Sequence, residues 1–188
     1  MPLETELKLR VQSHEPARER LRALGARCLG NALEENIILD RPDGSLRGRG
    51  MGLRVRLAVP EGGGEPVATL TLKGPRLPGV MKSRPEYEVV VDDHGVVLQI
   101  LHTLGFLPIL KYEKRRESWL LGECRVELDE PVHIGRFIEI EGPDTDAIRA
   151  AQRDLSLEDC ENQPSSYVHM LLTYCAEHGI ADRVVSFT

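Results

Sequence analysis

The chain has 188 residues, 41% of them hydrophobic and 29% charged, with a formal net charge of −6. This size supports one domain with a sizeable core and argues against two. The acidic balance argues against general binding of nucleic acids, and no apolar run approaches the ~20 residues needed to span a bilayer.

Apolar and polar residues alternate over most of the chain, with capping residues and turn signals between the alternating stretches. In chain order, the expected elements are a strand (3–12), a helix (13–25), four strands (28–41, 52–59, 67–73 and 84–92), a helix (93–104), three strands (109–121, 123–129 and 135–141) and two helices (145–154 and 165–178). Pro16 suits a first helical turn, and Asp93 and Asp144 suit helix N-caps.

The connections are also readable. Residues 60–66 predict a hairpin loop, residues 74–83 a longer loop and residues 179–188 a peripheral tail. The pattern predicts a single α+β domain over residues 1–188 with about eight antiparallel strands. The N-terminus shows no basic and apolar leader pattern, so we expect a cytoplasmic protein.

Ionisable residues recur at i, i+2 spacing within the expected strands. Six segments share this spacing: Glu4–Lys8, Arg54–Arg56, Arg84–Glu88, Lys114–Arg116, Glu127–Asp129 and Glu139–Glu141. Because successive side chains of a strand point to opposite faces, the charges of each segment share one face. About eight antiparallel strands can close into a barrel. We therefore expect an eight-stranded antiparallel β-barrel with a charged interior and flanking helices over its apolar outer face.

Both signs of charge are expected inside this barrel. The acids are Glu4, Glu6, Glu86, Glu88, Glu127, Asp129, Glu139 and Glu141; the bases are Lys8, Arg10, Arg54, Arg56, Lys73, Arg84, Lys114 and Arg116. Converging carboxylates suit a hard cation such as Mg²⁺ or Mn²⁺, whereas converging Arg and Lys side chains suit phosphates. No Gly-x-x-x-x-Gly-Lys-Ser/Thr loop is present, so the bases would replace the loop amides of P-loop proteins. Arg10 lies near its strand end, where we expect a solvated or ion-paired side chain.

The N-terminal run Glu4-Thr5-Glu6-Leu7-Lys8 resembles the ExExK signature of the CYTH family, the triphosphate tunnel metalloenzymes. This family includes class IV adenylyl cyclases and thiamine triphosphatases. Further pieces follow in the family's order: Leu53–Arg56, Leu72-Lys73, Arg84–Glu88, Leu104–Phe106, Lys114–Arg116, Glu127–Asp129, Gly135–Glu141 and Ser166-Tyr167. The ordered set covers about residues 3–172, which we take as the core of the domain.

The resemblance implies a tunnel that binds a triphosphate together with divalent metal ions. It places the carboxylates on the metal side, namely Glu4, Glu6, Asp129, Glu139 and Glu141. It places the bases against phosphate oxygens, namely Lys8, Arg54, Arg56, Lys73, Arg84, Lys114 and Arg116. Catalysis is expected from Glu4, Glu6 and Lys8.

Other roles stay open at this point. Glu86 and Glu88 lie on a family strand without an assigned role, and Glu127 either joins the acids or pairs with a tunnel base. Some family members carry a basic residue just before the C-terminal Ser-Tyr, whereas residues 162–165 of this chain contain no Lys or Arg. A phosphate contact from that segment is therefore in question.

We expect an enzyme that hydrolyses an inorganic or organic triphosphate, such as triphosphate, ATP or thiamine triphosphate. Two alternatives remain: a class IV-type adenylyl cyclase that makes cyclic AMP and pyrophosphate, and a non-catalytic module that binds polyphosphate or nucleotide. We expect no nucleic-acid or membrane partner. The apolar C-terminal helix could pack on its own barrel or on a second copy, so a homodimer is also open.

Overall fold

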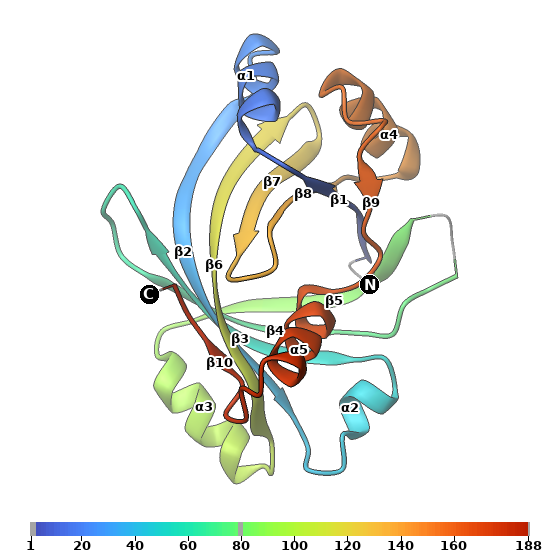
Figure 1. Ribbon diagram of the computed structural model, residues 1–188. Coiled ribbons are helices and arrows are strands. Elements are labelled where there is room, and N and C mark those ends of the chain that lie inside the picture. Colours follow the sequence, from blue (N-terminus) through green and yellow to red (C-terminus); the bar gives the residue numbers. More distant parts are fainter. Residues whose placement is uncertain (1–2, 79–80, 188) are drawn as a thin grey trace.

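The computed structural model describes residues 3–78 and 81–187. Within these residues, eight strands close into an antiparallel barrel: β1 (Leu3–Val11), β2 (Arg27–Asp40), β3 (Gly52–Pro60), β4 (Val67–Lys73), β5 (Lys82–Val91), β6 (Leu107–Leu121), β7 (Cys124–Pro131) and β8 (Arg136–Glu141). The order around the ring is β1-β5-β4-β3-β2-β6-β7-β8, and β8 pairs with β1 again (Figure 1). The predicted fold is confirmed.

Of the helices in the described residues, three lie between these strands in the chain, and two follow β8. They are α1 (Glu15–Ala23), α2 (Ser45–Gly48), α3 (His94–Thr103), α4 (Thr145–Asp154) and α5 (Tyr167–Glu177). The predicted caps are confirmed, because the carboxylates of Asp93 and Asp144 accept hydrogen bonds from the amides of Val96 and Ala147 at 3.0 and 2.8 Å.

The alternation pattern did not predict α2. The buried carboxylate of Asp40 holds this short helix, because it accepts hydrogen bonds from the amides of Leu46 at 2.9 Å and Arg47 at 3.1 Å. Four residues are too few for an amphipathic period to show in the sequence. The local pattern therefore predicts no element over residues 45–48.

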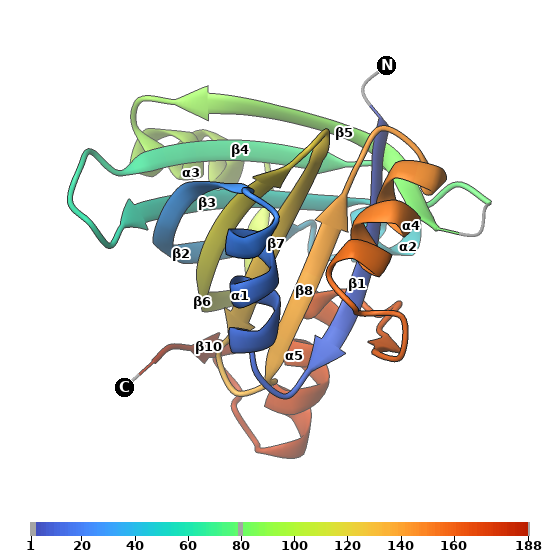
Figure 2. The same cartoon turned by 90° about the horizontal axis from the view of Figure 1, so that it is seen from above.

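Apolar residues on the outer face of the barrel form the core with the helices. α1 and α4 cover β1, β7 and β8, where Leu21 and Ile148 pack in one cluster with Ile140. α3 packs over β2 and β3 through Leu101. In Figure 1 these helices lie outside the ring of strands, whereas α5 lies within its outline. Figure 2, turned by 90°, shows α5 at one end of the barrel.

Helix α5 closes this end through apolar contacts with its own barrel. Leu171 is fully buried, and Tyr167 packs edge-on against Phe137 of β8 with 5.2 Å between ring centroids. The sequence left open whether this helix packs on its own barrel or on a second copy of the chain. The structure shows it packed on its own barrel.

Most described residues after Gly179 are exposed, as expected of a peripheral tail, but part of the segment is fixed to the barrel. β10 (Val184–Val185) pairs in parallel with β6, and Val185 is buried in the cluster beneath α5. The amide of Phe187 donates a hydrogen bond to Glu113 at 2.6 Å. A two-residue strand depends on a distant partner, so no local period could reveal it.

The register brings the charged residues of neighbouring strands into opposition on the inner face. Glu4 faces Arg84, Lys8 faces Glu139, and Lys114 faces Glu34 across their strand pairs. Because each strand alternates with a period of two, one opposed pair places the whole inner row of both strands. The barrel interior is therefore charged, as the spacing predicted.

Candidate functional site: a charged cavity inside the barrel

The barrel surrounds a cavity of about 790 Å³. The predicted residues that line it are Glu4, Glu6, Lys8, Arg54, Arg56, Lys73, Arg84, Glu86, Glu88, Lys114, Arg116, Glu127, Glu139 and Glu141. The volume lies within the range of about 300–1,000 Å³ that is usual for small-molecule sites. Of the predicted site residues, Asp129 does not reach the lining of the described cavity.

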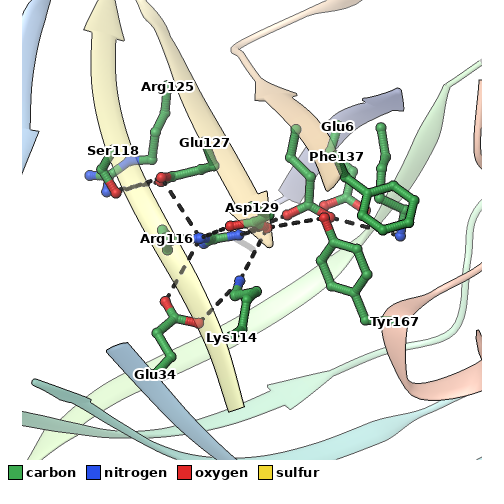
Figure 3. A network of polar contacts seen from close by, with 12 residues as sticks. Glu6, Glu34, Lys114, Arg116, Ser118, Arg125, Glu127, Asp129, Phe137 and Tyr167 are labelled. Carbon is green, nitrogen blue, oxygen red and sulfur yellow. Dashed lines mark hydrogen bonds and ion pairs between the residues drawn. The ribbon is translucent and has the colours of Figure 1, made fainter. Parts of the chain in front are cut away.

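Asp129 lies behind the cavity wall and is completely buried. Its carboxylate accepts hydrogen bonds from Arg116 at 2.6 and 2.7 Å, from Lys114 at 3.2 Å and from the Tyr167 hydroxyl at 3.0 Å (Figure 3). Two cations and a hydroxyl thus engage both of its oxygens. The contacts indicate that Asp129 orients the bases and anchors α5, rather than offering a free ligand to a metal ion.

Glu34 of β2 organises the bases from the opposite side, and the charge-spacing pattern missed it. Its carboxylate lies 3.0 Å from Arg56, 3.0 Å from Lys114 and 3.7 Å from Arg116. Burial would raise the pKa of Glu34, but these three cations hold it well below its usual range. Its i+2 neighbour is the uncharged Asn36, so the sequence shows no pair of charges at i, i+2 spacing there.

The basic group comprises Lys8, Arg54, Arg56, Lys114 and Arg116. Burial lowers the pKa of Lys8, although the charges of Glu139 and Asp129 oppose that effect. Burial also lowers the pKa of Lys114, and the charge of Arg116 lowers it further. These shifts show cations that lack full solvation and repel one another, so an anion in the cavity would stabilise them.

Arg54 and Arg56 of the basic group also lie beside Glu88 of β5. Glu88 lies 3.5 Å from Arg54 and 3.7 Å from Arg56, and it accepts a hydrogen bond from Thr71 at 2.7 Å. Burial would raise the pKa of Glu88, but Thr71 and the two arginines lower it. The role that the sequence left open for Glu88 is thus to pair with these arginines.

An acidic group forms where β1, β5 and β8 meet. Lys73 lies 2.7 Å from Glu4 and 2.6 Å from Glu86, and Arg84 lies 3.2 Å from Glu4. Burial and the contact with Glu4 raise the pKa of Glu86, and burial and the charge of Glu4 raise that of Glu141. Glu4 itself has a lowered pKa, because Lys73 and Arg84 overcome its burial.

Two further carboxylates lie between the basic and acidic groups. Glu139 lies 2.9 Å from Arg116 and 3.8 Å from Lys8. Glu127 accepts a hydrogen bond from Ser118 and lies 3.8 Å from Arg116, so it does pair with a tunnel base. Burial raises the pKa of Glu127, whereas Arg116 and Lys8 lower that of Glu139 against the effect of its burial.

Four cations that line the cavity were not predicted, namely Arg47, Arg76, Lys82 and Arg125. Lys82 forms an ion pair with Glu6, and Arg76 lines the cavity near the start of α5. Both fall within residues 74–83, which the sequence assigned to a loop. Lys82 begins β5, and only the pairing of that strand with β1 turns its side chain toward Glu6.

Arg10 and Trp119, two residues outside the predicted site, have structural contacts. Arg10 donates a hydrogen bond to the carbonyl of Ile134 at 3.1 Å and lies over the Phe137 ring, so it is neither fully solvated nor ion-paired with another described residue. Trp119 is buried in the core beneath α1 and α4. Tyr112 differs, because it is buried and still lines the cavity, and burial raises its pKa to about 12.

Several carboxylates of the cavity could serve as ligands of a divalent metal ion. Among residues 3–78 and 81–187, no three Asp, Glu, His or Cys side chains stand close enough together to form a ready-made metal site. Glu4, Glu86 and Glu141 nevertheless offer oxygen ligands, and the raised pKa values of Glu86 and Glu141 mean that added positive charge would stabilise them. The acidic group therefore offers the oxygen chemistry that a hard cation needs, although no three of its described carboxylates stand close together.

The structure contains no helix, in the part of the chain that it describes, with the length and apolar character to cross a membrane.

Comparisons with known proteins agree with this geometry. A candidate adenylate cyclase of Methanocaldococcus jannaschii is 28% identical over 139 residues, which cover 74% of this chain and 76% of that protein. The solved structure of the PH1819 protein of Pyrococcus horikoshii has a TM-score of 0.77 and 27% identity, covering 91% of this chain and 99% of the other.

A more distant structure shows the same fold. It is a candidate adenylyl cyclase from Hippeastrum, described as having a dominant triphosphatase activity, with a TM-score of 0.69, 17% identity and coverage of 91% and 96%. Residues 2–164 match the CYTH domain family. With the ordered motifs and the charged barrel interior, this match shows that the chain belongs to the CYTH domain family.

Proposed function

We propose that this protein is a metal-dependent enzyme that hydrolyses a triphosphate compound inside the barrel. One observation carries the proposal: a buried basic group and an acidic group line the same cavity. The first suits the oxygens of a phosphate chain, and the second suits the metal ions that accompany such a chain. Phosphoryl transfer depends mainly on positioning and on neutralising charge, which this arrangement can supply.

Each group has a distinct task in this proposal. Lys8, Arg54, Arg56, Lys114 and Arg116 hold the phosphate oxygens, and Asp129 and Glu34 keep the last two bases in place. Glu4 and Glu6 of β1, with Glu86 of β5, would hold Mg²⁺ or Mn²⁺. The metal would neutralise charge on the phosphates and lower the pKa of a bound water.

Glu141 is the carboxylate that we assign to the attacking water. It makes no ion pair with any other described residue, whereas Glu4, Glu6 and Glu86 each contact a cation. Its raised pKa makes it a better proton acceptor than an ordinary glutamate. The water oxygen bonds to the terminal phosphorus, the bridging P–O bond breaks, and the water proton passes to Glu141, so inorganic triphosphate yields orthophosphate and diphosphate.

A class IV-type adenylyl cyclase is the second candidate. The name of the Methanocaldococcus jannaschii relative favours it, and so do the apolar side chains of Tyr112, Leu53 and Leu172 on the cavity wall, which could contact an adenine ring. In that reaction the ribose 3′-oxygen attacks the α-phosphorus, and pyrophosphate leaves. The cyclase-named protein from Hippeastrum with triphosphatase activity shows that such a name does not decide between the two reactions.

Product analysis tests the proposal. Purified protein is incubated with triphosphate, ATP and thiamine triphosphate, each with Mg²⁺ and with Mn²⁺, and the products are separated. Orthophosphate supports hydrolysis, cyclic AMP with pyrophosphate supports the cyclase, and tight binding without turnover would leave a binding module.

A matched pair of variants connects the activity to the cavity. Arg116→Lys keeps the charge but loses the two-pronged guanidinium contact, whereas Arg115→Lys changes the exposed neighbour on the outer face of β6. We expect turnover to fall only in Arg116→Lys. Equal turnover in the two variants would place the reaction outside this cavity.

A further inference from the structure

Arg76 and Arg47 both line the cavity and form no ion pair with another described residue, and Arg76 is the one that is tied to the segment before α5. Eight other cations of the lining each form an ion pair with a glutamate or aspartate. They are Lys8, Arg54, Arg56, Lys73, Lys82, Arg84, Lys114 and Arg116. Arg76 forms none with the residues described in the structure, and the charged neighbour that affects its pKa most is another cation, Arg84, which lowers it. Arg76 is exposed, so water and the Pro164 carbonyl compensate its charge, and no carboxylate of a described residue does.

Hydrogen bonds of the backbone and of the side chain fix the position of Arg76. The flanking backbone is fixed by hydrogen bonds from the amide of Gly74 to Pro85 and from the amide of Leu77 to Ser83, both at 2.8 Å. The guanidinium itself donates a hydrogen bond to the carbonyl of Pro164 at 2.7 Å. The side chain thus joins the connection between β4 and β5 to the segment that leads into α5.

That segment lies directly beside the basic group. The amide of Gln163 donates a hydrogen bond to the carbonyl of Lys8 at 2.8 Å. The charge of Arg76 is also close enough to lower the pKa of Lys8. An anion that contacts the Lys8 ammonium therefore lies within the field of Arg76, whose remaining guanidinium N–H groups are available for charge-assisted hydrogen bonds.

We propose that Arg76 is a substrate-binding residue that contacts the phosphate chain at the cavity rim beside α5. It brings positive charge to the segment 162–165, which has no Lys or Arg of its own. This inference rests on the proposed triphosphate site and adds to it a contact from the connection between β4 and β5.

Binding of inorganic triphosphate, measured by calorimetry with a chelator present to prevent turnover, tests this role. Four variants are compared with the wild type: Arg76→Ala, Arg76→Gln, Arg76→Lys and Arg49→Ala. Arg49 is exposed and does not line the cavity, so its removal controls for the loss of one positive charge. Gln can still donate to the Pro164 carbonyl, so Arg76→Gln separates that structural contact from the charge.

We expect Kd to rise about tenfold in Arg76→Ala and Arg76→Gln, as for the loss of one charge-assisted hydrogen bond. Arg76→Lys should retain most of the affinity, and Arg49→Ala should match the wild type. Wild-type affinity in Arg76→Ala, or recovery in Arg76→Gln, would overturn the role of Arg76 while leaving the triphosphate site intact. Failure of the wild type to bind triphosphate would instead overturn the proposed function.

Discussion

Glu34 offers the sharpest test of how the barrel holds its bases, because its carboxylate is buried between three of them. In Glu34→Gln, Lys114 and Arg56 lose partners at 3.0 Å. Removing one member of a buried ion pair costs about 3–5 kcal/mol. Lys114 keeps Asp129 at 3.2 Å and Arg56 keeps Glu88 at 3.7 Å, so we expect the lower end, about 3 kcal/mol.

For a chain of this size, 1 kcal/mol corresponds to about 2–4 °C in Tm, so Glu34→Gln should melt about 6–12 °C below the wild type. Triphosphate should raise Tm more in this variant than in the wild type, because the ligand supplies negative charge that the variant lacks. Differential scanning calorimetry with and without triphosphate measures both effects.

The control is Glu35→Gln, the same change one residue along β2. Glu35 is exposed on the outer face, so its loss should change Tm by less than about 2 °C. If Glu34→Gln also melted within about 2 °C of the wild type, Glu34 would not be holding the basic group, and the account of the site would be refuted.

Three further predictions concern the same network. Tyr167→Phe removes the hydroxyl that donates to Asp129 at 3.0 Å, so we expect Tm to fall by about 3–12 °C. The control is Tyr87→Phe on the exposed face of β5, which should change Tm little. Equal Tm values for the two variants would contradict the anchoring role of Tyr167. The lowered pKa of Glu34 stabilises the fold above the unfolded-state pKa of about 4.3, and this stability is lost as pH falls through the folded-state value. Urea unfolding between pH 3 and 6 should therefore show that the free energy of unfolding falls more steeply on acidification in the wild type than in Glu34→Gln. Equal pH dependence of this free energy in the two proteins would contradict the lowered pKa of Glu34. Glu6→Ala should remain folded yet lose metal-dependent turnover by orders of magnitude, while Glu19→Ala on the exposed side of α1 keeps it; near-normal turnover in Glu6→Ala would remove Glu6 from the metal site.

The period of two in the strands was readable from the sequence because it is a local property. It predicted that Glu4, Glu6 and Lys8 share a face, and that Arg54 and Arg56 share another segment of that same inner face. The structure shows all five lining one cavity. Helix N-caps such as Asp93 and Asp144 were also readable, because a cap bonds to an amide only three residues away.

The burial of individual side chains and the pairing of residues far apart in the sequence were decided by the tertiary structure. The alternation of side chains along β7 predicted that Asp129 lies on the inner face. Its burial behind the bases depends on the packing of α5, and there its carboxylate accepts hydrogen bonds from Arg116 and Tyr167. Lys82 and Arg76 acquire their roles from partners 76 and 88 residues away, and Glu34 acquires its role from the register of β2 and β6. Such contacts leave no period in the sequence, because closure of the barrel, and not local geometry, brings the partners together.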